Sequence, residues 1–139
     1  MITPDIAERE LLEGYLMIPD AHERLTAIVD DNTGPGIPEA ERSEGDLVPG
    51  CVSRVWLTAR GEGDKLHLRW DADSPMIKGL AGLICRIYDG LPLATACVYD
   101  AGVIAGLGLD RQLSPSRLNG LGALKVRIRT RAGELAAYA

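Results

Sequence analysis

The sequence predicts an α+β fold with two N-terminal helices, a three-stranded antiparallel sheet, and several C-terminal helices that pack on one face of the sheet. Apolar residues recur at helical spacing before residue 32 and again after residue 74, which indicates amphipathic helices at both ends. Between residues 52 and 70 they alternate with polar residues, the pattern of half-buried strands. Helices and strands are therefore segregated along the chain, which is typical of α+β proteins and disfavours a parallel nucleotide-binding sheet.

A single domain over residues 1–139 accounts for the length and composition. The chain is 46% hydrophobic, which is enough to bury a core without disulfides or a structural metal. Within the domain, residues 32–46 contain several Gly and Pro residues, too many for the interior of a helix. We expect this segment to be an exposed Gly/Pro-rich linker that ends in a brief strand around Leu47.

Two helices are predicted before this linker. Thr3 and Pro4 resemble an N-cap and first-turn pair, and they begin a short first helix. Asp20 and Glu23 have the spacing of a capping box, which predicts the start of the second helix. That helix ends near Asn32.

A β-hairpin with one buried face follows the linker. Val55, Leu57 and Ala59 alternate with polar residues, and the same alternation resumes after a turn at residues 61–64. Because only one face is apolar, we expect the next helix to cover it.

Two Ser-Pro pairs mark the starts of the later helices. Ser74 and Pro75 begin a strongly amphipathic helix that Gly90 ends. A short helical stretch is expected at residues 101–107. The final helix starts at residues 114–115 and carries basic residues on its outer side.

Charge and composition argue against several classes of function. The net charge of −5 and the absence of Phe provide neither a basic footprint nor a stacking surface for nucleic acid. No N-terminal signal pattern and no apolar run of about 18 residues is present, so we expect no membrane association and a cytoplasmic location. Residues 1–50 are acidic and residues 111–139 basic, which describes either solvated helix faces or an acidic surface for a basic partner.

Three cysteines stand at wide spacings. Their odd number argues against a disulfide framework and suits a reducing compartment, so at least one thiol is free. Cys85 and Cys97 lie in apolar settings and are interpreted as structural. His22 and His67 fall on the polar sides of their elements, where exposure to solvent is expected.

Cys51 is the candidate reactive residue. It follows Pro49 and Gly50, which place its thiol at a loop tip before the first long strand. Such a thiolate can attack the outer sulfur of a persulfide on another protein, and without a neighbouring cysteine it would keep the sulfur it receives. An ordinary thiol with a pKa of about 8.5 is only slightly ionised near pH 7, and Arg54 is a candidate cation to raise the thiolate fraction.

Three stretches resemble one known family. The sequence VPGCVSRVW at residues 48–56 resembles the GCxSxVW signature of SufE-like sulfur acceptors, which contain the iron–sulfur metabolism associated domain. The D-S-x-x-I-x-x-G-L helix of that family resembles residues 73–80, which have one residue fewer between Ile77 and Gly79, and its L-[ST]-P-S-R-x-N-G-L segment resembles residues 113–121. The resemblance covers residues 48–128.

The resemblance implies a SufE/NifU-like fold and a role for Cys51 as a persulfide-forming acceptor. The sulfur donor would be a pyridoxal-phosphate-dependent cysteine desulfurase (SufS-like), which the protein would stimulate, and the recipient an iron–sulfur scaffold complex (SufBCD-like). The protein itself would be no enzyme and would bind no cofactor or metal. Partner contacts are expected at Gly50, Arg54, Asp73 and Arg117. Asp73 is alternatively explained by the dipole of the following helix, and Arg117 by a pair with a helix-end carboxylate.

Three other functions are alternatives. A metal or cluster scaffold would use Cys51, Cys85 and Cys97 with a His or Asp, although the spacings fit no recognised ligand pattern. A regulatory module would stimulate a desulfurase without receiving sulfur. A Cys–His hydrolase would need His22 or His67 beside Cys51, which nothing local suggests.

Overall fold

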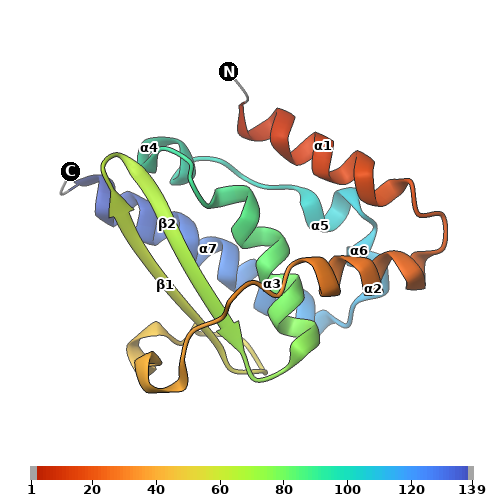
Figure 1. Ribbon diagram of the computed structural model, residues 1–139, viewed down its shortest axis with the longest axis horizontal. Coiled ribbons are helices and arrows are strands. Elements are labelled where there is room, and N and C mark those ends of the chain that lie inside the picture. Colours follow the sequence, from red (N-terminus) through yellow and green to blue (C-terminus); the bar gives the residue numbers. More distant parts are fainter. Residues whose placement is uncertain (1–2, 138–139) are drawn as a thin grey trace.

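The computed structural model describes residues 3–137 and has an α+β architecture (Figure 1). Its regular elements are α1 (Pro4–Leu16), α2 (Ala21–Asp31), β1 (Val55–Glu62), β2 (Lys65–Ala72), α3 (Pro75–Tyr88), α4 (Leu93–Ala96), α5 (Val103–Gly106), α6 (Leu109–Gln112) and α7 (Pro115–Ala137). Short 3₁₀ turns occur at Glu39–Glu41 and Glu44–Asp46. None of the helices in this part of the chain is long and apolar enough to cross a membrane.

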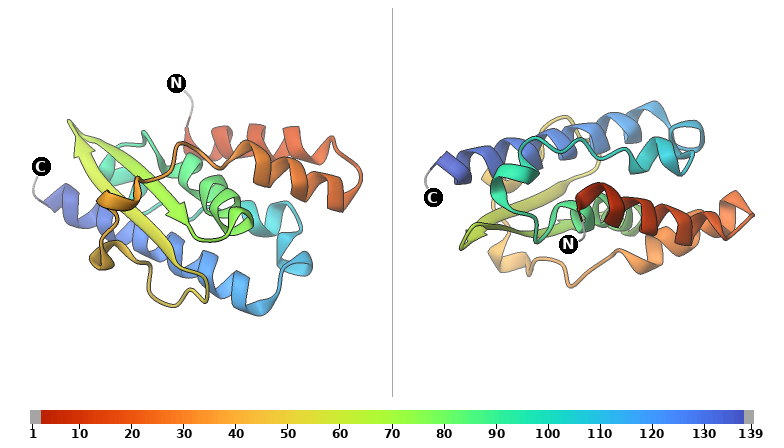
Figure 2. Two further views of the ribbon diagram at one scale, coloured as in Figure 1. Left: turned by 60° about the horizontal axis from the view of Figure 1, so that its bottom comes forward. Right: turned by 90° about the horizontal axis from the view of Figure 1, so that it is seen from above.

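Helix α3 occupies the centre of the molecule. It packs against β2, α2 and α7, and ten of its fourteen residues are buried. The protein core therefore surrounds it on nearly every side. Helix α7 runs lengthwise along β1 and α3, while α1 and α2 lie on the opposite side of α3 (Figure 2). As predicted, α3 and α7 cover the apolar face of the hairpin.

The predicted third strand is wrong. β1 and β2 form a two-stranded antiparallel sheet, in register from Val55–Ala72 to Glu62–Lys65. Leu47 contributes one isolated bridge to Trp56, and Val48 N–H donates to the Val55 carbonyl at 2.8 Å. A 3₁₀ turn immediately precedes Leu47, while Pro49 has no N–H to donate, so no longer strand can form there.

Local capping signals correctly marked three helix starts. The Asp20 carboxylate accepts from Glu23 N–H at 2.9 Å at the start of α2. Ser74 accepts from Ile77 N–H at 3.5 Å before α3, and Ser114 accepts from Arg117 N–H at 3.3 Å before α7. At α1, Thr3 occupies the N-cap position, but its hydroxyl donates to the Asp5 carboxylate and caps no backbone N–H.

Glycines allow α2 and α3 to cross at close range. A Cβ atom at Gly82 would lie 1.7 Å from the Asn32 carbonyl oxygen, and one at Gly79 would lie 2.5 Å from the Val29 carbonyl oxygen. Neither position can accept a side chain without moving α2, so these two glycines determine the packing distance between the helices.

The linker at residues 32–46 is exposed at most positions but is anchored at Ile37, which is buried. Ile37 N–H donates to the Asp71 carboxylate at 2.8 Å, and the Arg42 guanidinium pairs with the same oxygen at 3.0 Å. Burial alone would raise the pKa of Asp71, but the N–H groups of Ile37 and Ala72 and the charges of Lys78 and Arg42 lower it on balance. The linker is therefore attached to the sheet by one ionised carboxylate.

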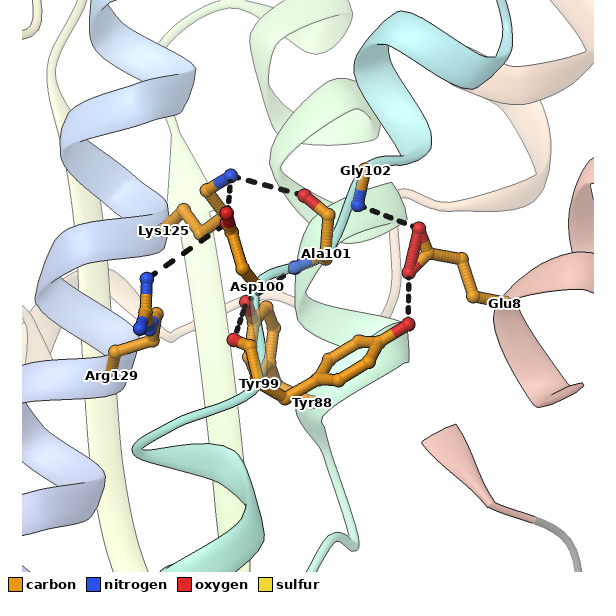
Figure 3. Close-up of polar contacts among 8 residues, drawn as sticks. All are labelled: Glu8, Tyr88, Tyr99, Asp100, Ala101, Gly102, Lys125 and Arg129. Carbon is orange, nitrogen blue, oxygen red and sulfur yellow. Dashed lines mark hydrogen bonds and ion pairs between the residues drawn. The ribbon is translucent and has the colours of Figure 1, made fainter. Parts of the chain in front are cut away.

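A polar network joins α1 to the segment after α4 (Figure 3). The buried Glu8 carboxylate accepts from the Tyr99 hydroxyl at 2.6 Å and from Gly102 N–H at 2.7 Å. The Tyr88 hydroxyl on α3 donates to the Tyr99 carbonyl at 2.7 Å. On α7, Lys125 pairs with Asp100 at 2.6 Å, so elements from both ends of the chain are held together at this point.

Candidate functional site

Cys51 lies in a loop at residues 49–54 whose two ends are held by backbone hydrogen bonds. Val48 N–H donates to the Val55 carbonyl at 2.8 Å, and Asp73 N–H donates to the Arg54 carbonyl at 3.2 Å. Inside the loop, Gly50 has a φ of +86°, a conformation that favours glycine. A short loop with a flexible position thus stands on a rigid hairpin.

The Cys51 side chain is half-buried and faces an apolar pocket between the loop, α3 and α7. The pocket has a volume of about 30 Å³, enough for at least one water molecule. Its apolar walls come mainly from Val55, Ile77, Ala81, Leu121 and Leu124. These side chains exclude water from one side of the thiol.

Gly120 on α7 contacts the thiol through its backbone. The Cys51 Sγ donates to the Gly120 carbonyl at 3.4 Å, and a Cβ atom at Gly120 would lie only 3.3 Å from Sγ. This residue was missed as a site residue by sequence reasoning. The available signal was a glycine on the buried side of an amphipathic helix, next to Leu121, where a larger residue would be expected.

Burial raises the pKa of the Cys51 thiol above its ordinary value. No cation within residues 3–137 offsets this effect. The predicted activating cation, Arg54, instead lies over the Trp56 ring, 5.6 Å from its centroid, with Arg42 at 4.9 Å from the same centroid. Arg54 does not line the Cys51 pocket, whereas Val55, the residue between Arg54 and Trp56, does.

The structure brings the other predicted contact residues close to the same loop. Arg117, in the first turn of α7, lines the Cys51 pocket and is exposed. It forms no ion pair with a carboxylate of residues 3–137, so the alternative of a helix-end pair has no support in this part of the chain. Asp73 is also exposed and is joined to Arg54 through the backbone.

The remaining thiols and imidazoles lie apart from Cys51. Cys85 is 0% exposed, and burial raises its pKa. Cys97 packs beside Gly133 on α7, thirteen residues beyond Gly120, which corresponds to about 20 Å along the helix. Neither histidine lines the Cys51 pocket. Within residues 3–137 no three His, Cys, Asp or Glu side chains are grouped so that they could hold a metal ion, and the scaffold alternative has no geometric support.

Comparisons with known proteins agree with the motifs. A family model described as "SufE: Fe-S metabolism associated domain" matches residues 9–132. Uncharacterized SufE-like proteins of Rhizobium etli and Rhizobium meliloti are each 28% identical over 129 residues, which cover 88% of this chain and 87% and 92% of those proteins. The solution structure of a hypothetical protein from Thermus thermophilus superposes with a TM-score of 0.76 at 24% identity over 100% of both chains, which shows that the fold is shared.

Proposed function

This chain belongs to the SufE family, whose domain is associated with Fe–S metabolism, and from that premise we propose that Cys51 is a sulfur acceptor and carrier. The supporting observation is a single thiol, half-buried at a loop tip, that faces an apolar pocket with about 30 Å³ of unfilled space. That space holds at least one water-sized group, so it leaves room for one added sulfur atom. A persulfide formed on Cys51 would be sheltered from water while it is carried.

The transfer is a thiol exchange between two proteins. The Cys51 thiol loses its proton, and the thiolate attacks the outer sulfur of a persulfide on a cysteine desulfurase. The sulfur–sulfur bond of the donor breaks, its cysteine leaves as a thiolate, and Cys51 becomes the new persulfide. Because the freed donor cysteine can begin another cycle, the desulfurase is stimulated. Cys51 then passes the sulfur to an iron–sulfur scaffold complex.

The donor has to supply part of the activation. Burial raises the pKa of Cys51, so the resting protein holds a thiol, which is a weak nucleophile. A cationic or hydrogen-bonding pocket on the desulfurase would increase the thiolate fraction only when the two proteins meet. The proposed contacts for that partner are Gly50 and Arg54 within the loop and Asp73 and Arg117 beside it. A reducing compartment such as the cytoplasm suits three free thiols.

Mass spectrometry of Cys51 tests this function. After incubation with a pyridoxal-phosphate-dependent desulfurase and cysteine, we expect an added mass of about 32 Da on the peptide that contains Cys51, the mass of one sulfur atom. Cys97→Ser should retain the adduct, whereas Cys51→Ser should lose it together with the stimulation. Absence of the adduct on Cys51, or full stimulation by Cys51→Ser, would contradict the proposal and favour a purely regulatory role.

A further inference from the structure

Helices α1 and α2 are joined by a short turn and lie at the end of the molecule away from the tip of the hairpin (Figure 1). An open groove of about 560 Å³ lies where these two helices meet the C-terminal end of α3. Its lining comes from both helices, from the turn between them, and from Arg86 on α3. None of these residues lines the Cys51 pocket, so the groove is a separate surface.

Apolar side chains line the groove and continue beyond it into solvent. Leu11, Ile18 and Ala27 are partly buried in its walls. Met17, which follows α1 in helical conformation, is 82% exposed and lies on the same side of the helix as Gly14, a lining residue. A flexible methionine beside a groove adapts to the shape of a bound protein, which is why methionine is common at such surfaces.

The charge of the groove is acidic. Glu10 on α1 and Asp31 on α2 line it, and neither forms an ion pair with another residue of the described range 3–137. The two helices and their turn, residues 4–31, carry eight Asp and Glu against two Arg. One of these, Arg24, is held by backbone carbonyls of the turn. The surface therefore complements a basic partner.

A chain of hydrogen bonds fixes the floor of the groove. The Tyr15 hydroxyl donates to the Asp31 carboxylate at 3.0 Å and accepts from the Asn32 amide at 3.0 Å. The Arg86 guanidinium donates to the amide oxygen of buried Asn32 at 2.6 Å, and it offsets only part of the acidic charge. Asp31 is thus held in one orientation before a partner arrives, which lowers the entropy cost of binding.

The form of the groove favours a helix as its occupant. Extended peptides bind by adding a strand to the edge of a sheet, but the residues that line this groove belong to helices or to the turn between them. An amphipathic helix instead lays its apolar side in a hydrophobic groove, with its charged residues at the margins. A second copy of this chain fits less well, because Lys125, Arg129 and Arg131 of its basic helix α7 already pair with carboxylates of their own chain.

We propose that this groove is a docking site for a basic amphipathic helix of a partner protein. The apolar side of that helix packs on the groove walls and on Met17, and its Lys or Arg side chains pair with Glu10 and Asp31. The site goes beyond the sulfur-acceptor function and does not depend on it. Because the groove and the Cys51 pocket share no residue, the helix can be bound while another protein reaches the thiol.

Binding of a synthetic helix tests the proposal. The probe is a fluorescein-labelled peptide of about 18 residues, long enough to form a helix, with Leu at helical spacing on one side and Lys elsewhere. Fluorescence anisotropy measures its affinity. We expect Glu10→Lys to weaken binding about tenfold, because an attractive contact becomes a repulsive one. Met17→Ser should weaken it about fivefold, because apolar contact area is lost.

Glu39→Lys is the matched control. Glu39 is exposed, lies outside the groove and forms no ion pair within residues 3–137, so this variant makes the same change in net charge. It should change the affinity by less than about twofold. Equal weakening by Glu39→Lys and Glu10→Lys would mean that the peptide senses only net charge, which overturns the proposal. Absence of measurable binding, or equal binding of a peptide with Glu in place of Lys, also overturns it.

Alkylation of Cys51 shows whether the bound peptide leaves the thiol free. In a Cys97→Ser background, Cys51 is the accessible thiol, because Cys85 is fully buried. Its rate of reaction with iodoacetamide should be the same with and without saturating peptide. A rate that falls several-fold would place the peptide over the Cys51 loop and overturn the proposal. No desulfurase is present in these measurements, so their failure leaves the sulfur-acceptor function standing, and failure of sulfur transfer leaves the docking site standing.

Discussion

Gly120 determines how closely α7 approaches the Cys51 thiol. The adjacent part of the helix offers a natural comparison, because a Cβ atom at Gly122 would meet no atom within 4 Å, whereas one at Gly120 would lie 3.3 Å from Sγ. Both glycines lie in the same helix and share the same intrinsic cost relative to alanine. A difference in stability between the two alanine variants therefore reports the effect of the contact with Cys51.

Gly122→Ala should increase the free energy of unfolding by about 0.5–1 kcal/mol, as expected for an exposed helical glycine. Gly120→Ala should give no such gain, because Sγ has to move, and it should accelerate alkylation of Cys51 several-fold. Chemical denaturation and iodoacetamide kinetics in the Cys97→Ser background measure both effects. Equal stabilisation by the two variants with unchanged alkylation would show that the contact has no consequence.

The raised pKa of Cys51 determines the pH dependence of its reactivity. The thiolate is the reactive form, so alkylation should rise with pH and reach half of its maximum above about pH 8.5, the ordinary midpoint of a thiol. The same protein unfolded in denaturant should show the ordinary midpoint. A folded-state midpoint at or below about 8.5 would mean that a cation near Cys51 outweighs the effect of burial.

At the scale of elements, long-range contacts attach the less regular segments to the hairpin and helices. The linker is the clearest case, since Asp71 at the end of β2 holds Ile37 and Arg42 from a segment about thirty residues earlier. The same linker places Arg42 over Trp56 at the start of β1. Loss of the Asp71 charge should therefore loosen the linker and the base of the Cys51 loop together.

Asp71→Asn should reduce the free energy of unfolding by about 2–3 kcal/mol at pH 7, because a buried, hydrogen-bonded charge pair is broken. Glu62→Gln, in an exposed pair with Arg60, is the control and should change it by less than about 0.5 kcal/mol. The folded-state pKa of Asp71 is lowered, so its contribution is present above its unfolded pKa of about 3.9 and is lost as the pH falls further. Urea unfolding from pH 7 to pH 3 should show the free energies of unfolding of the native protein and of Asp71→Asn converging in acid. A constant difference between them over that range would contradict this account.

At the scale of the whole molecule, the network of Glu8, Tyr99 and Gly102 connects elements that are far apart in the sequence. It joins α1, near one end of the chain, to the segment that α7 also holds through Lys125 (Figure 3). Burial, and then the hydrogen bond to Glu8 and its charge, raise the pKa of Tyr99. A group with a raised folded-state pKa contributes stability below its unfolded pKa and loses it as the pH rises.

Tyr99→Phe should lower the free energy of unfolding by about 1.5–3 kcal/mol at pH 7, because the buried carboxylate loses a donor. The gap between the native protein and the variant should narrow above about pH 10, the ordinary pKa of a tyrosine. Denaturant unfolding of both proteins between pH 7 and pH 11 measures this difference in the free energy of unfolding. A constant difference between the native protein and Tyr99→Phe over that range would show that Tyr99 has the same pKa in the folded and unfolded states.

Many local features of this protein were predictable because a few neighbouring residues produce them. Asp20 and Ser74 cap their helices through N–H groups three residues away. The hairpin turn was expected at residues 61–64 and lies within that range, at residues 63–64, because Gly61 and Glu62 still pair in the sheet. The third strand is absent for a local reason as well, because Pro49 and the turn before Leu47 leave no room for a ladder. Glu8 was not expected to be buried, since its partners Tyr99 and Gly102 are more than ninety residues away.

The sequence by itself determined where the candidate thiol stands: Pro49 and Gly50 make the turn, and the alternation from Val55 makes the strand that follows. Only the tertiary structure decided what surrounds it. Gly120, 69 residues away, accepts from its sulfur, and Trp56 holds the Arg54 side chain that was expected to activate it. Backbone turns depend on torsion angles of adjacent residues, whereas the solvation and charge around a thiol depend on which distant side chains the packing brings within a few ångströms.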